Sequence, residues 1–124
     1  MFRYTTAMKI GTDIIQIKRI EILIEKYGKT FKKRFLTEDE IASLKKIESI
    51  AGYWAAKEAI SKALGCGIGK NLSFHDIIIS KDHLGAPSFK LSLTAQKIHH
   101  IQSSSLSISH DGGFAIAVAV IHTK

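Results

Sequence analysis

Apolar residues follow helical spacing through the first half of the chain and alternate with polar residues through much of the second half. Lys9–Ile15 is short, apolar and rich in β-branched residues, a composition typical of a strand. In Ile17–Tyr27 the apolar residues recur at helical spacing, and Gly28 follows as a stop signal. We therefore expect a strand that leads directly into a helix.

Two further helices are predicted before the chain turns to strands. A capping box begins at Thr37, whose side chain can cap the amide three residues on while Glu40 reaches back. Ile50–Leu64 is rich in alanine and is followed by a glycine, so it is predicted to be a helix, with Gly65–Gly69 as a loop. Lys29–Arg34 is a basic stretch to which the pattern assigns no element.

From Leu72 onward the pattern changes to strands. Asp111–Gly113 has the composition of a hairpin turn between the last two of them. No repeat, low-complexity tract or linker divides the chain. We therefore predict a single α+β domain, with early helices packed on a mainly antiparallel sheet. The later elements expected are strands at Phe74–Ser80, Pro87–Leu93, Ser105–His110 and Phe114–Ile121, and a short helix at Thr94–Ile101.

Composition agrees with one folded domain. The chain has 124 residues, of which 45% are hydrophobic and 23% charged, and this balance argues against disorder. The formal net charge of +7 attracts anions such as nucleic acid, acidic proteins, phosphorylated ligands or anionic membranes, without choosing among them. The same charge also serves simple solubility.

One cysteine, Cys66, allows no internal disulfide, and we expect a reducing, cytoplasmic setting. No apolar run approaches the roughly 18 residues of a membrane span. Met1–Ala7 lacks the apolar stretch of a signal peptide. It is expected to be an N-terminal extension or a cloning remnant, with the domain occupying residues 8–124.

The helix at Ile50–Leu64 holds a candidate pair of charged residues. Glu58 and Lys62 are four apart and lie on one helix face, which alone would indicate an exposed ion pair. The helix, however, leads into a loop containing Gly65 and Gly67, where backbone amides can approach phosphate. A carboxylate for a metal, an ammonium for phosphate and a glycine loop would then lie close together.

Asp13 is an acidic residue inside an apolar strand and requires an explanation. It shares a strand face with Gly11 and Ile15. With Glu58 it would supply the oxygen ligands that Mg²⁺ prefers. Alternatively, Asp13 caps the helix that begins nearby. Spacing alone does not bring Asp13 and Glu58 together.

The histidines give a weaker signal. His110 ends a strand, where it could titrate, bind phosphate or be structural. His99, His100 and His110 lack the spacing of a zinc site, and with only Cys66 available we reject zinc. No glycine-rich loop of the Walker or dinucleotide type is present.

Four motifs stand in order between about Met8 and Ile121, and the second, on the alanine-rich helix, is the most specific. They are Gly11–Ile14 with Lys18–Ile20, Trp54–Ala59 with Lys62–Gly67, Gly85–Pro87, and Ser107–His110 with Ala115–Ala117. Together they resemble the holo-acyl-carrier-protein synthase family of phosphopantetheinyl transferases.

The resemblance implies a 4′-phosphopantetheinyl transferase fold and a definite reaction. A serine hydroxyl of apo acyl carrier protein attacks the β-phosphate of coenzyme A, and 3′,5′-ADP leaves. Asp13 and Glu58 would bind Mg²⁺ and take part in catalysis with Lys62, and Glu58, or a water that it orients, would accept the proton. The residues that the resemblance assigns to coenzyme A are Lys62, Gly65, Gly67, Ser109 and His110.

The family also implies partners. Its members work in fatty acid biosynthesis and form homotrimers with active sites between subunits. Acyl carrier protein is acidic, and the basic first helix and the stretch after it would suit it, with Arg19 as the best candidate contact. No role with nucleic acid or membrane is implied.

Three positions depart from the family pattern. Tyr53 stands where an arginine that contacts the coenzyme A 3′-phosphate is usual, Thr12 replaces an aliphatic residue, and Cys66 replaces a threonine.

Three other functions compete with the transfer reaction. They are a basic nucleic-acid-binding module, a Mg²⁺-dependent phosphohydrolase with the same carboxylates, and the larger transferase type that modifies peptide-synthetase carriers.

Overall fold

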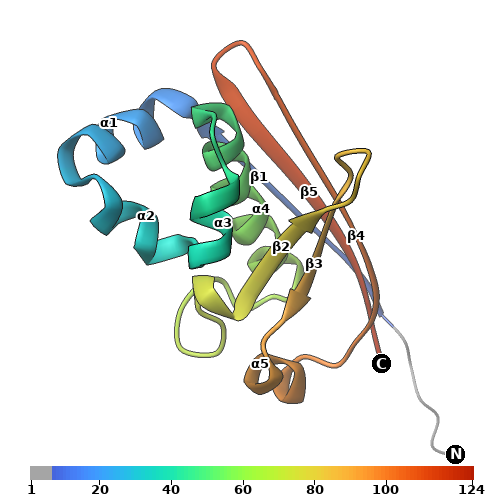
Figure 1. Ribbon diagram of the computed structural model, residues 1–124. Helices are drawn as coiled ribbons and strands as arrows, with labels where there is room; N and C mark the ends of the chain where they lie inside the picture. Colours follow the sequence, from blue (N-terminus) through green and yellow to red (C-terminus); the bar gives the residue numbers. More distant parts are fainter. Residues whose placement is uncertain (1–6) are drawn as a thin grey trace, which may run out of the picture.

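A computed structural model describes residues 7–124 as two antiparallel sheets and five α-helices (Figure 1). One sheet has the strand order β1-β5-β4 and the other pairs β2 with β3. The predicted α+β class is confirmed. The elements are β1 (Ala7–Gln16), α1 (Ile17–Tyr27), α2 (Lys29–Phe35), α3 (Glu38–Ser43), α4 (Ile47–Ala63), a 3-10 turn (Phe74–Asp76), β2 (Ile77–Lys81), β3 (Pro87–Leu91), α5 (Leu93–Ile98), β4 (Ile101–Asp111) and β5 (Phe114–Thr123).

The molecule is built in layers around α4. This helix lies across one face of the β1-β5-β4 sheet, and α1, α2 and α3 lie on its other side (Figure 1). Much of α4 is therefore buried, including Ile50, Ala51, Ala55 and Ile60. The face of the sheet that contacts α4 is called the inner face below.

Strand β1 packs very closely on α4 at Gly11. A Cβ on this glycine would overlap the carbonyl oxygen of Ala59 and would lie 2.6 Å from the amide nitrogen of Ala63. Gly52 of α4 makes a similar approach, since its Cβ would lie 2.8 Å from Cγ2 of Ile108. Only glycine at position 11 allows the two backbones to meet in this way.

The neighbouring strand contributes small side chains to the same contact. Ala115, Ala117 and Ala119 of β5 alternate along the inner face and are all fully buried. On α4, Ala55 and Ala59 face them from within the core. Alanine on both layers keeps helix and sheet close, which fixes the height of α4 above the sheet.

The outer face of this sheet is apolar over two strands and polar over the third. Met8, Ile10 and Ile14 of β1 are 64%, 62% and 60% exposed, and in the register Ile10 pairs with Val120 and Ile14 with Ile116 of β5. On β4 the outer face carries Ser103, Ser105, Ser107 and Ser109. Contiguous exposed apolar surface of this kind marks an interaction site.

Helix α2 was not predicted, and aromatic packing explains it. Phe31 and Phe35, one turn apart, are both buried with ring centroids 5.1 Å apart. Phe35 also meets Trp54 of α4 edge-on at 5.1 Å. The basic residues Lys32, Lys33 and Arg34 fill the last turn of α2.

The prediction of a strand from Phe74 was wrong at its start, because the 3-10 turn Phe74–Asp76 precedes β2.

A buried ion pair ties α4 to its neighbours. The Lys57 ammonium donates to Oε1 of Glu40 at 2.8 Å and to the carbonyl oxygen of Phe74 at 3.1 Å. Glu40 in turn accepts from the amides of Thr37 and Ile79. The Lys57 and Glu40 side chains are 0% and 3% exposed. The predicted capping box at Thr37 is confirmed, and its glutamate has this second role.

The chain start lies partly outside the described residues. Residues 1–6 of the expected extension Met1–Ala7 are not described, and Ala7 opens β1. Among residues 7–124, no helix has the length and apolar character needed to cross a membrane.

Gly11→Ala tests the close approach of β1 to α4. The added Cβ would meet rigid backbone, so strand and helix must separate, and we expect the free energy of unfolding to fall by about 3 kcal/mol, the upper end of the usual cost of overpacking. Denaturant unfolding measures this change. Gly69→Ala is the matched control, because nothing lies within 4 Å of a Cβ there. Equal stability of the two variants would contradict the packing described.

Candidate active site

Asp13, Glu58 and Lys62 come together where β1 meets α4. The Lys62 ammonium donates a hydrogen bond of 2.9 Å to Oδ1 of Asp13. The Asp13 side chain is 14% exposed and that of Lys62 is 52% exposed. The alternative that Asp13 caps α1 is not observed, since Gln16 occupies the cap position of that helix.

The close approach at Gly11 explains this meeting. Asp13 is the next residue after Gly11 on the inner face of β1. Glu58 and Lys62 immediately precede Ala59 and Ala63, the two residues whose backbone Gly11 approaches. Since β1 is an edge strand, the side chains beside it stay open to solvent.

The three charges influence one another. Burial raises the pKa of the Glu58 carboxyl, the Asp13 carboxylate raises it further, and the Lys62 ammonium opposes both effects. The hydrogen bond to Asp13 raises the pKa of Lys62, and Glu58 adds a smaller upward effect. Two carboxylates with one ammonium leave a net negative charge, and such a site favours a further cation.

The donor set suits magnesium. Among the described residues no three His, Cys, Asp or Glu side chains gather to hold a metal, and the carboxylates available at this place are those of Asp13 and Glu58. Mg²⁺ is commonly held by one or two carboxylates, with water and substrate phosphate completing its shell. The half-buried Glu58 beside Asp13 fits that pattern.

The glycine loop after α4 turns the chain and caps the helix. Gly65 and Gly67 have φ of 80° and 66°, which favour glycine. Their amides donate to the carbonyl oxygens of Lys62 and Ser61. In this structure these amides therefore serve the end of α4, and the part of Gly65 and Gly67 in binding coenzyme A stays a prediction.

A second group of motif residues lines a separate hollow of about 210 Å³. It joins Tyr53 of α4, Gly85 and Pro87 of the β2–β3 hairpin, and His110 of β4. Lys81 also lines it and places its ammonium 5.6 Å from the centre of the Tyr53 ring. The Gly85–Pro87 motif and the Ser107–His110 motif, far apart in sequence, thus meet at this hollow.

The remaining predicted residues lie apart from the Asp13–Lys62 pair. His110 shares the inner face with Asp13 but stands on β4, with β5 between them. Ser109, its neighbour, lies on the outer face, because successive strand residues alternate. Arg19 is exposed on α1, three residues after β1 ends.

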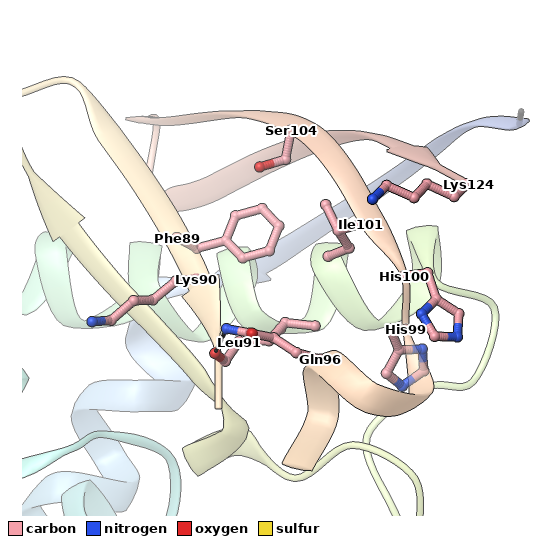
Figure 2. A pocket seen from close by; sticks show the side chains of 9 residues that line it. All are labelled: Phe89, Lys90, Leu91, Gln96, His99, His100, Ile101, Ser104 and Lys124. Carbon is pink, nitrogen blue, oxygen red and sulfur yellow. Dashed lines mark hydrogen bonds between the residues drawn. The ribbon is translucent and has the colours of Figure 1, made fainter. Parts of the chain in front are cut away.

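Another hollow, of about 360 Å³, lies between β3, α5 and β4 (Figure 2). Phe89, Leu91 and Ile101 form its apolar part, and His99 and His100 stand at one end. Its lining residues include no Asp or Glu. It contains none of the predicted site residues and is separate from the candidate site.

Lys57 is the residue that the sequence interpretation missed. It lies directly before Glu58 and is fully buried. The sequence did contain a signal for its burial, because Tyr53, Ala56 and Ile60 surround this lysine on an otherwise apolar part of the helix. Its partner Glu40 could not be identified, because that carboxylate was already explained by the capping box.

Glu58→Gln removes a carboxylate that is costly to ionise in the folded chain. Because the folded-state pKa lies above 4.5, the folded chain holds this proton to higher pH than the unfolded chain. Stability is therefore lost as pH rises through the folded pKa. We expect the variant to melt at a higher temperature than the wild type at about pH 7.5. This difference in melting temperature should disappear below about pH 4.5.

Thermal unfolding followed by circular dichroism checks this pH dependence. Glu25→Gln is the matched control, because Glu25 is exposed on α1, away from the site. If the difference in melting temperature between Glu58→Gln and the wild type widened as pH fell, the described environment of Glu58 would be contradicted.

Comparison with known proteins agrees with this geometry. The sequence pattern of the 4′-phosphopantetheinyl transferase superfamily matches residues 9–119. A holo-acyl-carrier-protein synthase of a Sulfurovum species is 68% identical over 114 residues, covering 92% of this chain and 96% of that protein. One of a Nitratiruptor species is 57% identical and covers 90% of this chain and 97% of that protein.

A solved structure gives the same result. The crystal structure of Helicobacter pylori holo-acyl-carrier-protein synthase in complex with coenzyme A is 52% identical and superposes with a TM-score of 0.87. The match covers 90% of this chain and 98% of that one. The family resemblance predicted from the four motifs is confirmed, and this chain belongs to the 4′-phosphopantetheinyl transferase superfamily.

Proposed function

We propose that this chain transfers the 4′-phosphopantetheine group from coenzyme A to a serine of apo acyl carrier protein, in fatty acid biosynthesis in the cytoplasm. The products are holo acyl carrier protein and adenosine 3′,5′-bisphosphate. The observation that carries the proposal is the group of Asp13, Glu58 and Lys62 at the edge of β1, in a chain so similar to holo-acyl-carrier-protein synthases.

Lys62 and Glu58 divide the work of the reaction. The Lys62 ammonium, half exposed beside Asp13, contacts the pyrophosphate of coenzyme A and offsets the charge that develops as the bond to phosphorus breaks. Glu58, or a water that it orients, accepts the proton of the attacking serine hydroxyl. The raised pKa of Glu58 makes this carboxylate a stronger base than an ordinary one.

Asp13 and Glu58 would hold Mg²⁺. When bound, the ion supplies positive charge that polarises the pyrophosphate and stabilises the leaving group. Asp13 is fixed for this role by its strand, because Gly11 holds β1 against α4 two residues earlier.

The nucleotide end of coenzyme A would lie in the hollow beside Tyr53. His110 lines that hollow, and Lys81 brings a cation over the Tyr53 ring. A cation from β2 can replace the arginine that the family usually has at the Tyr53 position. This observation supports coenzyme A binding despite the departure in sequence.

The acceptor would dock on α1 and α2. Arg19 is exposed at the start of α1, close in sequence to Asp13. Ile22 and Tyr27 on the same helix are 49% and 51% exposed, so an apolar contact is available beside the positive charges. A small acidic carrier protein fits such a surface through complementary charge and exposed apolar side chains.

The chain would assemble as a homotrimer through the outer face of the β1-β5-β4 sheet. Met8, Ile10 and Ile14 are each at least 60% exposed there, and an exposed apolar face of this kind favours contact with another subunit. Assembly would also allow one subunit to complete the site of another.

The transfer reaction is tested by the intact mass of apo acyl carrier protein after incubation with this chain, coenzyme A and Mg²⁺. We expect a gain of one phosphopantetheine group, lost when a chelator is added. Asp13→Asn and Glu58→Gln should each lower the rate by at least about 100-fold, since each removes a charge used in the reaction. Asp39→Asn, at an exposed carboxylate on α3, should leave the rate unchanged.

Other outcomes of this assay favour the competing functions. Release of adenosine 3′,5′-bisphosphate without any mass gain on the carrier would indicate a phosphohydrolase. Neither product, together with salt-dependent nucleic-acid binding that needs no Mg²⁺, would favour a binding module.

Arg19→Glu tests the acceptor surface. We expect the KM for apo acyl carrier protein to rise about tenfold, because a favourable charge contact becomes repulsive, while the KM for coenzyme A changes little. Lys97→Glu, a charge reversal on the distant helix α5, is the control. An unchanged acceptor KM would remove Arg19 from the docking surface.

Light scattering tests the trimer. We expect a mass three times the 13.7 kDa of one chain. Ile10→Lys should give monomers, because it places a charge on the apolar outer face. Leu84→Lys changes a residue that is 82% exposed in the β2–β3 turn and should leave the mass unchanged. A wild-type monomer would contradict the proposed assembly.

A further inference from the structure

Lys62 forms its ion pair with a residue of another element, not with the carboxylate on its own helix. Glu58 lies one helical turn away on α4, yet the Lys62 ammonium bonds to Asp13 on β1 instead. Among the described residues, Lys62 is the only cation within ion-pair distance of Asp13. The ammonium therefore contacts Oδ1 of Asp13, one of the two carboxylate oxygens that could ligate a metal ion.

We propose that Lys62 takes the place of the divalent cation on Asp13 and leaves it for the pyrophosphate of coenzyme A when the metal binds. This inference rests on the proposed function, which assigns Asp13 and Glu58 to the metal. It makes Lys62 a competitor of the metal before the substrate arrives, and a partner of the substrate afterwards.

The charges of the site explain why both cations do not remain on Asp13. With the side chain of Asp13 only 14% exposed beside Glu58, a counter-cation lowers the repulsion between the two carboxylates. A divalent ion neutralises both carboxylates, whereas the ammonium offsets only one charge. An ammonium that stayed on the same carboxylate would repel the ion at a few ångströms.

The Lys62 side chain has the freedom to move. It is 52% exposed, and Asp13 is its only side-chain partner among the described residues. Lysine carries its charge on a flexible four-carbon stem with three donors, so the ammonium can turn to a phosphate oxygen without moving α4. By linkage, a pyrophosphate that attracts Lys62 would also strengthen metal binding at Asp13.

Direct metal binding tests the competition without any measurement of transfer. The affinity for Mn²⁺ alone, titrated by electron paramagnetic resonance, is compared between wild type and Lys62→Met. We expect about twofold to fivefold tighter binding by the variant, the range to which an exposed ion pair corresponds. Lys9→Met is the control, because Lys9 lies on the same face of β1 four residues from Asp13 and removes an equal charge outside the pair. It should change the affinity less.

A second readout follows the Lys62 side chain itself. In protein labelled with ¹³C at lysine Cε, the Lys62 signal, assigned by its loss in Lys62→Met, should shift as Mg²⁺ is added and saturate with metal binding. Lysine signals remote from the site should stay in place. A Lys62 signal that does not move while Mg²⁺ binds would overturn the inference.

Asp13→Asn separates this inference from the proposed function. We expect this variant to lose Mn²⁺ binding. If it does, and Lys62→Met binds Mn²⁺ no more tightly than Lys9→Met, the exchange is wrong while the metal assignment stands. If Asp13→Asn binds Mn²⁺ as the wild type does, Asp13 is not a ligand, and both the exchange and the proposed metal site fail.

Discussion

The backbone contact between Gly11 and Ala59 is the constraint on which the site depends. It allows β1 and α4 to lie closer than side chains of ordinary size permit. Alanines of β5 and α4 extend the same close packing across the sheet. Because Asp13 follows Gly11 on one face, and Lys62 lies one turn beyond Glu58 on the other element, the charged groups meet only while this contact holds.

The Lys57–Glu40 pair fixes α4 from its other side. Lys57 is bonded to α3 and to the 3-10 turn, and Glu40 is bonded in turn to β2. Removing one partner of such a buried pair is costly, because the other is left charged in the core. Since Lys57 and Glu58 are adjacent, the position of the candidate base is set by a core contact as well as by the sheet.

The sequence patterns correctly predicted the features that depend only on residues close together in the chain. The strand face of Asp13, the capping box at Thr37 and the hairpin at Asp111–Gly113 all depend on neighbouring residues, and all are observed. Helix α2 was missed because Phe31 and Phe35 form a helix face only when Trp54 packs on them. The Asp13–Lys62 bond joins residues 49 apart, so its formation depends on how β1 sits on α4.

The alternation of β1 has a consequence for how this strand can change. Its odd-numbered residues Gly11 and Asp13 serve the helix contact and the charged group, while the even-numbered Ile10 and Ile14 form the apolar outer surface. A residue inserted or deleted between Gly11 and Asp13 would place these two residues on opposite faces of the strand. Point substitutions on one face can be tolerated separately, but the spacing from Gly11 to Asp13 cannot change.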